Sequence, residues 1–214
     1  MHVRHGFDEN LKDLHLDVVK MASLVEKTVE DAIQALKQKD TVLARKIIKQ
    51  DDVIDEMERT IENKCINLIA MQQPLARDLR MITAILKMIT DLERIADHST
   101  DIGKLIVEDR EEEQIKLLAD IPKMALVARE MVRGAIDAYV NNDIQLAQDI
   151  CSKDTVVDNY FDSLLEELQD IMKRRPECIN EATKYIFIVK YLEKIGDHAT
   201  NIGEWVIYNI TGNH

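Results

Sequence analysis

The chain has 214 residues, of which 46% are hydrophobic and 32% charged, while only 4% are aromatic and three are prolines. This composition indicates long helices, because sheets favour β-branched and aromatic residues and need frequent turn residues. The formal net charge of −12 argues against nucleic-acid binding, since an acidic surface repels phosphates, and it favours bound cations or a basic protein partner.

Apolar residues at steps of three and four predict three long helices in the first half of the chain. Asp40 has the residue type and position of an N-cap, and Pro74 breaks the pattern where a new helix can begin. The expected helices cover residues 10–39, 40–71 and 75–107.

The second half repeats this order after the acidic run EDREEEQ at 108–114. That run is either a solvated connector or the charged ends of two adjoining helices, and both interpretations mark the middle of the chain. Asn142 or Asp143 caps the fifth helix, and Pro176 opens the sixth. The expected helices cover residues 121–141, 144–174 and 176–210.

The two halves share sequence as well as helix order. KDTVLARKIIKQDDVIDEM at 39–57 resembles NDIQLAQDICSKDTVVDNY at 142–160, and DLERIADHSTDIG at 91–103 recurs as YLEKIGDHATNIG at 191–203. A repeat of this length predicts tandem duplication of one structural unit. We therefore predict an all-α fold of six long helices in two three-helix bundles, residues 1–112 and 113–214, packed side by side or end to end.

The recurring phrases place carboxylates on single helix faces. Glu93, Asp97 and Asp101 follow i, i+4, i+8 spacing, and Asp51 and Asp55 form a similar stripe on the preceding helix. The two stripes lie nearly equal numbers of residues before and after the turn between their helices, so an antiparallel hairpin brings them to the same level. The second half carries the matching set Asp154, Asp158, Glu193, Asp197 and Asn201.

Four or more converging carboxylates need compensating positive charge, which hard cations with oxygen ligands supply. Carboxylates can also bridge two metal ions, so each bundle is a candidate for a multinuclear cluster. The alternative is a solvated acidic face with water between the side chains. His98 and His198 point off the stripe, and we expect a neighbouring helix or water to satisfy them.

The sequence contains no nucleophile elbow, phosphate-binding glycine loop, zinc-protease motif or Glu-x-x-His pair, so it offers no positive sign of an enzyme. Its three cysteines form no C-x-x-C pair, which favours idle thiols in a reducing cytoplasm. We also expect neither a secretory signal nor a membrane-spanning segment.

The doubled LERIADHSTDI and LEKIGDHATNI phrases, with the turn QQPLARDLR at 72–80, resemble the PhoU family of bacterial phosphate-signalling regulators across nearly the whole chain. The resemblance implies two bundles related by an internal pseudo-two-fold, each with a multinuclear iron or zinc cluster. It implies that the ligands are Asp51, Asp55, Glu93, Asp97, Asp101, Asp154, Asp158, Glu193 and Asp197, with Asn201 departing from the acidic pattern and weakening the second set.

The resemblance further implies a non-enzymatic negative regulator of phosphate uptake and of the phosphate-starvation response. Its expected partners are the ATPase of the phosphate ABC transporter, a phosphate-sensing histidine kinase and a second copy in a homodimer. The expected location is the cytoplasm, with attachment to the inner membrane face through protein partners. Two alternative hypotheses are a carboxylate-bridged metal-dependent hydrolase or oxidase and a metal-free helical scaffold.

Overall fold

Two antiparallel three-helix bundles lie side by side in the computed structural model, which describes residues 2–72, 74–108 and 118–213. The first bundle consists of α1 (His2–Gln38), α2 (Thr41–Gln72) and α3 (Ala76–Glu108). The second consists of α4 (Asp120–Asn141), α5 (Ile144–Arg174), the short 3₁₀ turn η1 (Pro176–Cys178) and α6 (Ile179–Thr211). The predicted all-α fold of two tandem bundles is confirmed.

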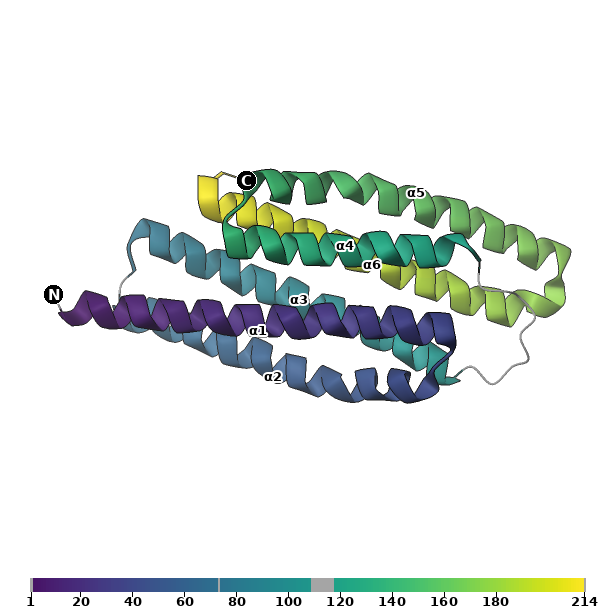
Figure 1. Ribbon diagram of the computed structural model, residues 1–214, viewed down its shortest axis with the longest axis horizontal. Helices are drawn as coiled ribbons and strands as arrows, with labels where there is room; N and C mark the ends of the chain where they lie inside the picture. The colour runs from purple at the N-terminus through teal and green to yellow at the C-terminus, as the bar shows by residue number, and fades with distance from the viewer. Residues whose placement is uncertain (1, 73, 109–117, 214) are drawn as a thin grey trace.

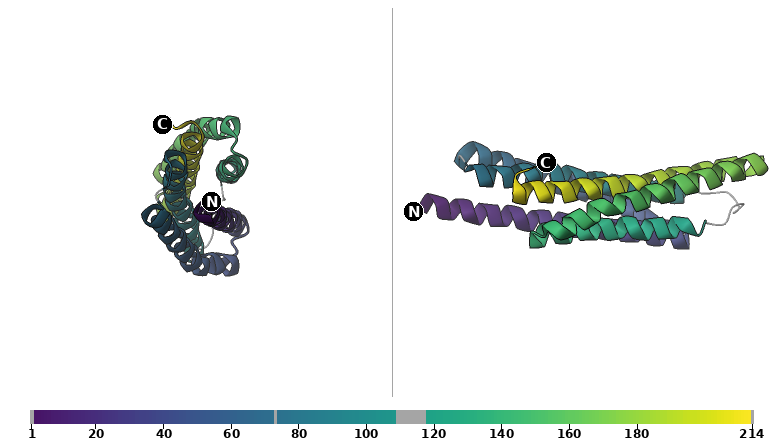
Figure 2. Two further views of the ribbon diagram at one scale, coloured as in Figure 1. Left: turned by 90° about the vertical axis from the view of Figure 1, so that its left-hand side faces the viewer. Right: turned by 90° about the horizontal axis from the view of Figure 1, so that it is seen from above.

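The bundles meet mainly along α3 and α6, which run antiparallel to each other (Figure 1, Figure 2). Arg80 near the start of α3 donates a hydrogen bond to the carbonyl of Asn209 near the end of α6. Farther along the two helices, His98 stacks on Tyr191. The central pair thus relates the two repeats by an approximate two-fold rotation.

Local capping fixes where the second helix of each bundle begins. The Asp40 carboxylate accepts hydrogen bonds from the backbone N–H of Val42 and Leu43, at 2.9 and 3.0 Å. Asp143 accepts one from Leu146 N–H at 3.0 Å. Asp143 is therefore the N-cap of α5, while Asn142 ends α4 with φ of 52°.

The first helix begins earlier than the sequence pattern predicts, at His2 rather than at residue 10. Phe7 is buried in the core and anchors the added turns. The segment before residue 10 has one large apolar residue and no repeating stripe, so periodicity alone did not reveal it. Most of the acidic run and the predicted boundary at 112/113 lie outside the described residues.

Glycines bring the helices of each hairpin close together. A Cβ on Gly103 would lie 3.3 Å from the carbonyl oxygen of Ala44, and one on Gly203 would lie 3.3 Å from that of Ala147. These contacts draw α3 against α2 and α6 against α5, less than two turns from Asp97 and Asp197. None of the described helices is apolar enough over a sufficient length to cross a membrane.

Candidate metal centres

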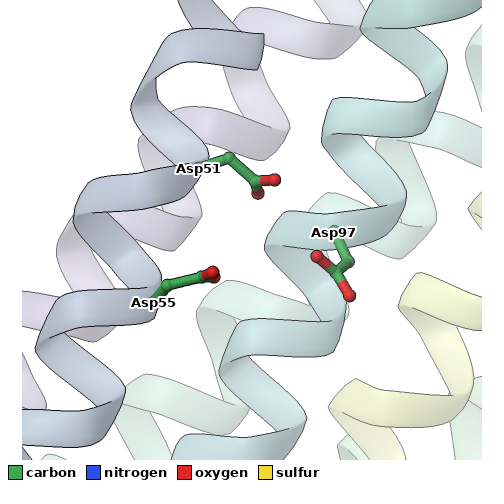
Figure 3. Close-up of side chains that lie close together, drawn as sticks. All are labelled: Asp51, Asp55 and Asp97. Carbon is green, nitrogen blue, oxygen red and sulfur yellow. The ribbon is translucent and has the colours of Figure 1, made fainter.

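One carboxylate trio lies in each bundle between its second and third helices. In the first trio, Asp51 and Asp55 project from α2 toward Asp97 on α3, and one oxygen of each lies within 4.8 Å of the others (Figure 3). The second trio has the same geometry and consists of Asp154, Asp158 and Asp197. The structure therefore brings together six of the ten residues singled out from the sequence.

A threonine orients one carboxylate in each trio. Thr100 donates a hydrogen bond to Asp51 at 3.1 Å, and Thr200 donates the equivalent bond to Asp154 at 3.2 Å. Both threonines belong to the repeated phrase, but the sequence pattern predicted no role for them. Their positions one turn beyond the trio's third aspartate let them reach across to the neighbouring helix.

Burial and mutual repulsion act on the carboxylates of both trios. Burial raises the pKa of Asp51, and the nearby charges of Asp97 and Asp55 raise it further. Burial likewise raises the pKa of Asp154, with added repulsion from Asp197 and Glu193. A bound cation would relieve this repulsion, because opposite charge favours the ionised form.

Exposed or partly exposed basic side chains pair with both trios, and one of them is Arg59, which lies 3.8 Å from Asp55. Arg94 pairs with Asp97 at 3.0 Å, and Lys194 pairs with Asp197. The Arg94 side chain is 54% exposed. Such exposed pairs are weak and screened, so they leave the trios available to a stronger cation.

Glu93 and Glu193 lie beside the trios without joining the group of converging oxygens. Burial raises the pKa of Glu93 to about 7, and Asp97 and then Glu58 add repulsion. Glu193 instead accepts hydrogen bonds from Lys190 at 2.8 and 3.0 Å. The two copies of this glutamate therefore have opposite electrostatic surroundings.

Asp101 and Asn201 point away from the converging oxygens. Asp101 pairs with Lys104 on its own helix at 2.7 Å. The Asn201 amide donates to Asp91 at 3.1 Å and so connects α6 to α3 of the other bundle. In this structure, Asn201 contributes to the contact between bundles.

The histidines also lie at the contact between bundles. His198 forms a hydrogen bond with Asp91 at 2.8 Å, as expected for a histidine held by a neighbouring helix. His98 stacks between Tyr191 and His198, with ring centroids 5.7 and 5.6 Å away. Its Nδ1 is buried and has no hydrogen-bond partner among the described residues. Asp91, a residue that sequence reasoning overlooked, corresponds to Tyr191 in the repeat.

The donor chemistry of the trios fits a metal ion. Each trio offers three carboxylates from two helices. A threonine orients one of them, Asp51 or Asp154, and burial raises the pKa of that carboxylate. Oxygen donors of this kind hold hard cations, and carboxylates can bridge two ions. The charges of Asp97 and Asp55 help to raise the pKa of Glu93, so Glu93 lies near the first trio. It is therefore a candidate for a further oxygen ligand there.

The fold and the paired trios define a duplicated helical-bundle protein with one acidic centre in each repeat. The PhoU domain model matches residues 18–106 and again residues 121–206. The chain belongs to the PhoU family. It is 41% identical over 210 residues to the phosphate-specific transport system accessory protein PhoU homolog of Clostridium acetobutylicum, covering 98% of this chain and 96% of that protein.

Solved structures support the same assignment. The crystal structure of PhoU from Pseudomonas aeruginosa superposes with a TM-score of 0.94 at 36% identity, covering 97% of this chain and 100% of that one. The phosphate transport system regulatory protein PhoU from Streptococcus pneumoniae superposes with a TM-score of 0.90 at 30% identity, covering 97% and 98%.

Proposed function

We propose that this chain is an accessory protein of a phosphate-specific transport system that regulates phosphate uptake and represses the phosphate-starvation response when phosphate is plentiful. Relatives that align over nearly their full length are named as accessory proteins of this transport system. The observation that carries the proposal is the match of both repeats to the PhoU domain and of nearly the whole chain to an accessory protein of this transport system.

The proposed role is regulatory rather than catalytic. The partners we propose are the ATPase component of the phosphate ABC transporter, a phosphate-sensing histidine kinase and a second copy of the chain. Contact with these partners would hold the protein at the cytoplasmic face of the membrane. Its strongly acidic surface suits protein partners better than free phosphate, which it repels.

We further propose that the two trios bind metal, with iron or zinc as the ions to test first. When bound, the metal supplies positive charge that holds the second and third helices of each bundle together. The protein's own part is to orient the ligands, which Thr100 and Thr200 do by their hydrogen bonds to Asp51 and Asp154. Asp97 and Asp197 then close each site from the facing helix.

A phosphate-responsive reporter in a host that lacks this protein tests the regulatory role. The wild-type chain should restore repression in phosphate-rich medium, and the double variant Asp97→Asn/Asp197→Asn should fail while remaining folded. A matched control, Asp101→Asn, changes a carboxylate outside the trios and should still repress. The proposal would be contradicted if the wild-type chain did not restore repression in phosphate-rich medium.

Pull-down experiments with the purified transporter ATPase and the kinase test the partners separately. Turnover assays with phosphoester substrates and with oxygen test the hydrolase or oxidase alternative. Measurable turnover that disappears in the Asp97→Asn/Asp197→Asn variant would favour that alternative.

A further inference from the structure

A groove runs between α1 and α2 on the outside of the first bundle. Its wider part has a volume of about 540 Å³ and its narrower part about 250 Å³, and Lys64 lies between the two parts and lines both. We call this feature the α1–α2 groove. Its apolar floor is formed on α2 by Val53, Met57, Ile61, Leu68 and Met71.

The groove is separate from the carboxylate trios. The floor residues recur at steps of three, four and seven, which places them on one face of α2. Asp51 and Asp55 lie on the opposite face, because Val53 is about 200° around the helix from Asp51. Anything bound in the groove therefore contacts neither trio directly.

Among the described residues, the floor exposes apolar surface at its two ends, while Ile61 and Leu68 between them are buried. Val53 is 52% exposed and Met71 is 79% exposed. An apolar stripe of this kind, bordered by charged residues, marks an interaction site. The distance from Val53 to Met71 along α2 is about 27 Å, which matches about five turns of a docked helix. A helix in this groove would extend the three-helix bundle to four helices.

Charge identifies the kind of helix that fits. The residues lining the groove include four carboxylates and a single basic group, Lys64, which is itself paired with Asp17. The carboxylates belong to Asp13, Asp17, Asp52 and Glu56. An acidic rim favours a basic partner and disfavours a second copy of a chain with net charge −12 or an anionic membrane surface.

The matching face of the second bundle places its charges differently. Thr155 and Asn159 of α5 stand where α2 carries Asp52 and Glu56, and Glu167 stands in place of Lys64. Val156 corresponds to Val53 and is 44% exposed, so the apolar position is kept without the two carboxylates beside it. The acidic residues next to Val53 are thus particular to the first bundle.

We propose that the α1–α2 groove binds a basic amphipathic helix of a partner protein. The apolar side of that helix packs against the floor, and its Lys or Arg side chains face the acidic rim. This inference goes beyond the regulatory function proposed above and holds whether or not the trios bind metal.

The test uses a fluorescein-labelled helical peptide of about 18 residues, with Leu on one face and Lys on the other, and chelator-treated full-length protein. Fluorescence anisotropy should show binding that weakens at least about 10-fold in Val53→Asp, since a buried charge faces the apolar side of the peptide. The matched control Val156→Asp adds the same charge at the equivalent position of the second bundle and should bind like the wild type. Circular dichroism verifies that both variants are folded.

The Val53→Asp variant separates groove binding from general attraction to an acidic protein. General attraction would strengthen with the added negative charge, so equal or tighter binding of the peptide by Val53→Asp overturns the proposal. Equal weakening by Val156→Asp overturns it as well. The double variant Asp52→Asn/Glu56→Gln should weaken binding several-fold and reduce its salt dependence.

Two further measurements examine other occupants of the groove. Sedimentation of the wild type and of Val53→Asp reports self-association through the groove, and flotation with vesicles of phosphatidylcholine and phosphatidylglycerol reports membrane binding. Loss of self-association or of flotation in Val53→Asp, without peptide binding by the wild type, contradicts the proposal. Peptide binding with neither effect supports it.

Discussion

The first and second bundles keep the same three carboxylates but surround them differently. Beside the first trio, Glu93 lies near Glu58, whose oxygen accepts a hydrogen bond from Thr90. At the matching positions, the second bundle has Phe161 and Lys190 in place of Glu58 and Thr90. Lys190 lies 5.1 Å above the Phe161 ring and also binds Glu193.

This difference shows which part of the duplicated site tolerates change. The trio and its threonine occur once in each repeat, and the hydrogen bond from threonine to aspartate has nearly the same length in both. The glutamate beside the trio lies near Glu58 in the first repeat and pairs with Lys190 in the second. The carboxylate trio is therefore the part that both repeats keep, and under the proposed metal binding the surrounding charges would set the affinity of each copy.

The largest expected effect concerns metal and stability. Adding a binding metal to chelator-treated protein at about 100 times its dissociation constant should stabilise the fold by roughly 2.7 kcal/mol per site. Asp97→Asn and Asp197→Asn should each remove one site's share, and the double variant should remove both. Calorimetry with and without iron or zinc measures these gains. Equal gains in the wild type and the double variant would show that the metal does not bind at the trios.

The next effect is a pH dependence that is strongest in the first bundle, where Glu93 has a pKa of about 7. Because the folded pKa of Glu93 is about 7 and its ordinary value is 4.5, the unfolded chain ionises first as the pH rises. Metal-free protein should lose stability between these pKa values, and Glu93→Gln should recover about 1–3 kcal/mol above the higher one. Urea unfolding at about pH 4 and about pH 8 measures the difference.

Glu193→Gln is the matched control for this comparison. Lys190 and Lys194 both pair with Glu193, so replacing it removes favourable contacts and gives no stability at high pH. An equal gain in both variants would show that the two glutamates have the same surroundings.

A smaller effect should follow from exchanging the neighbouring residues of the two repeats. Lys190→Thr removes one of the two lysine partners of Glu193 and should tighten metal binding by the second trio about 3–10-fold, in line with the modest strength of a partly exposed ion pair. Thr90→Lys should weaken the first trio by a similar factor. Calorimetric titration in an Asp97→Asn or Asp197→Asn background isolates each trio. If neither exchange changes the metal affinity, the residues at positions 90 and 190 are not the cause of a difference in affinity between the two trios.

The smallest effect concerns the helix caps. Asp40→Ala and Asp143→Ala should each cost about 1 kcal/mol, with the greater cost at Asp40 because it accepts two backbone hydrogen bonds. Asn retains a capping oxygen, so Asp40→Asn and Asp143→Asn should cost little. Urea unfolding compares the four variants, and equal losses in the Ala and Asn forms would argue against capping.

The sequence predicts the helices and the six trio residues because both depend on local spacing. Periodicity places each apolar stripe, and equal chain distance from a tight turn brings Asp51 and Asp55 level with Asp97. Repetition of the same phrase in the second half supplies an independent check on each assignment. The start of α1 was misplaced, since Phe7 alone did not mark the added turns. The start of α6 was also misplaced, since Pro176 opens a 3₁₀ turn and the α-helix begins at Ile179.

The contact between bundles was not predictable in the same way. Asp91 bonds with His198 and Asn201, residues more than 100 positions later in the chain, and no local pattern connects them. Likewise, helical spacing places Glu93, Asp97 and Asp101 on one stripe, but it does not show which of them faces α2. The rotation of α3 between two neighbours decides this, and that rotation is set by packing against α6.

The central claim is that each bundle binds metal through its carboxylate trio. Elemental analysis of the purified protein, together with Asp97→Asn, Asp197→Asn and the double variant, tests it most directly. The account predicts bound metal in the wild type, a reduced content in each single variant and none above background in the double variant. Metal content that is unchanged by all three substitutions, or a wild-type protein that binds no metal even when iron or zinc is supplied, would contradict it.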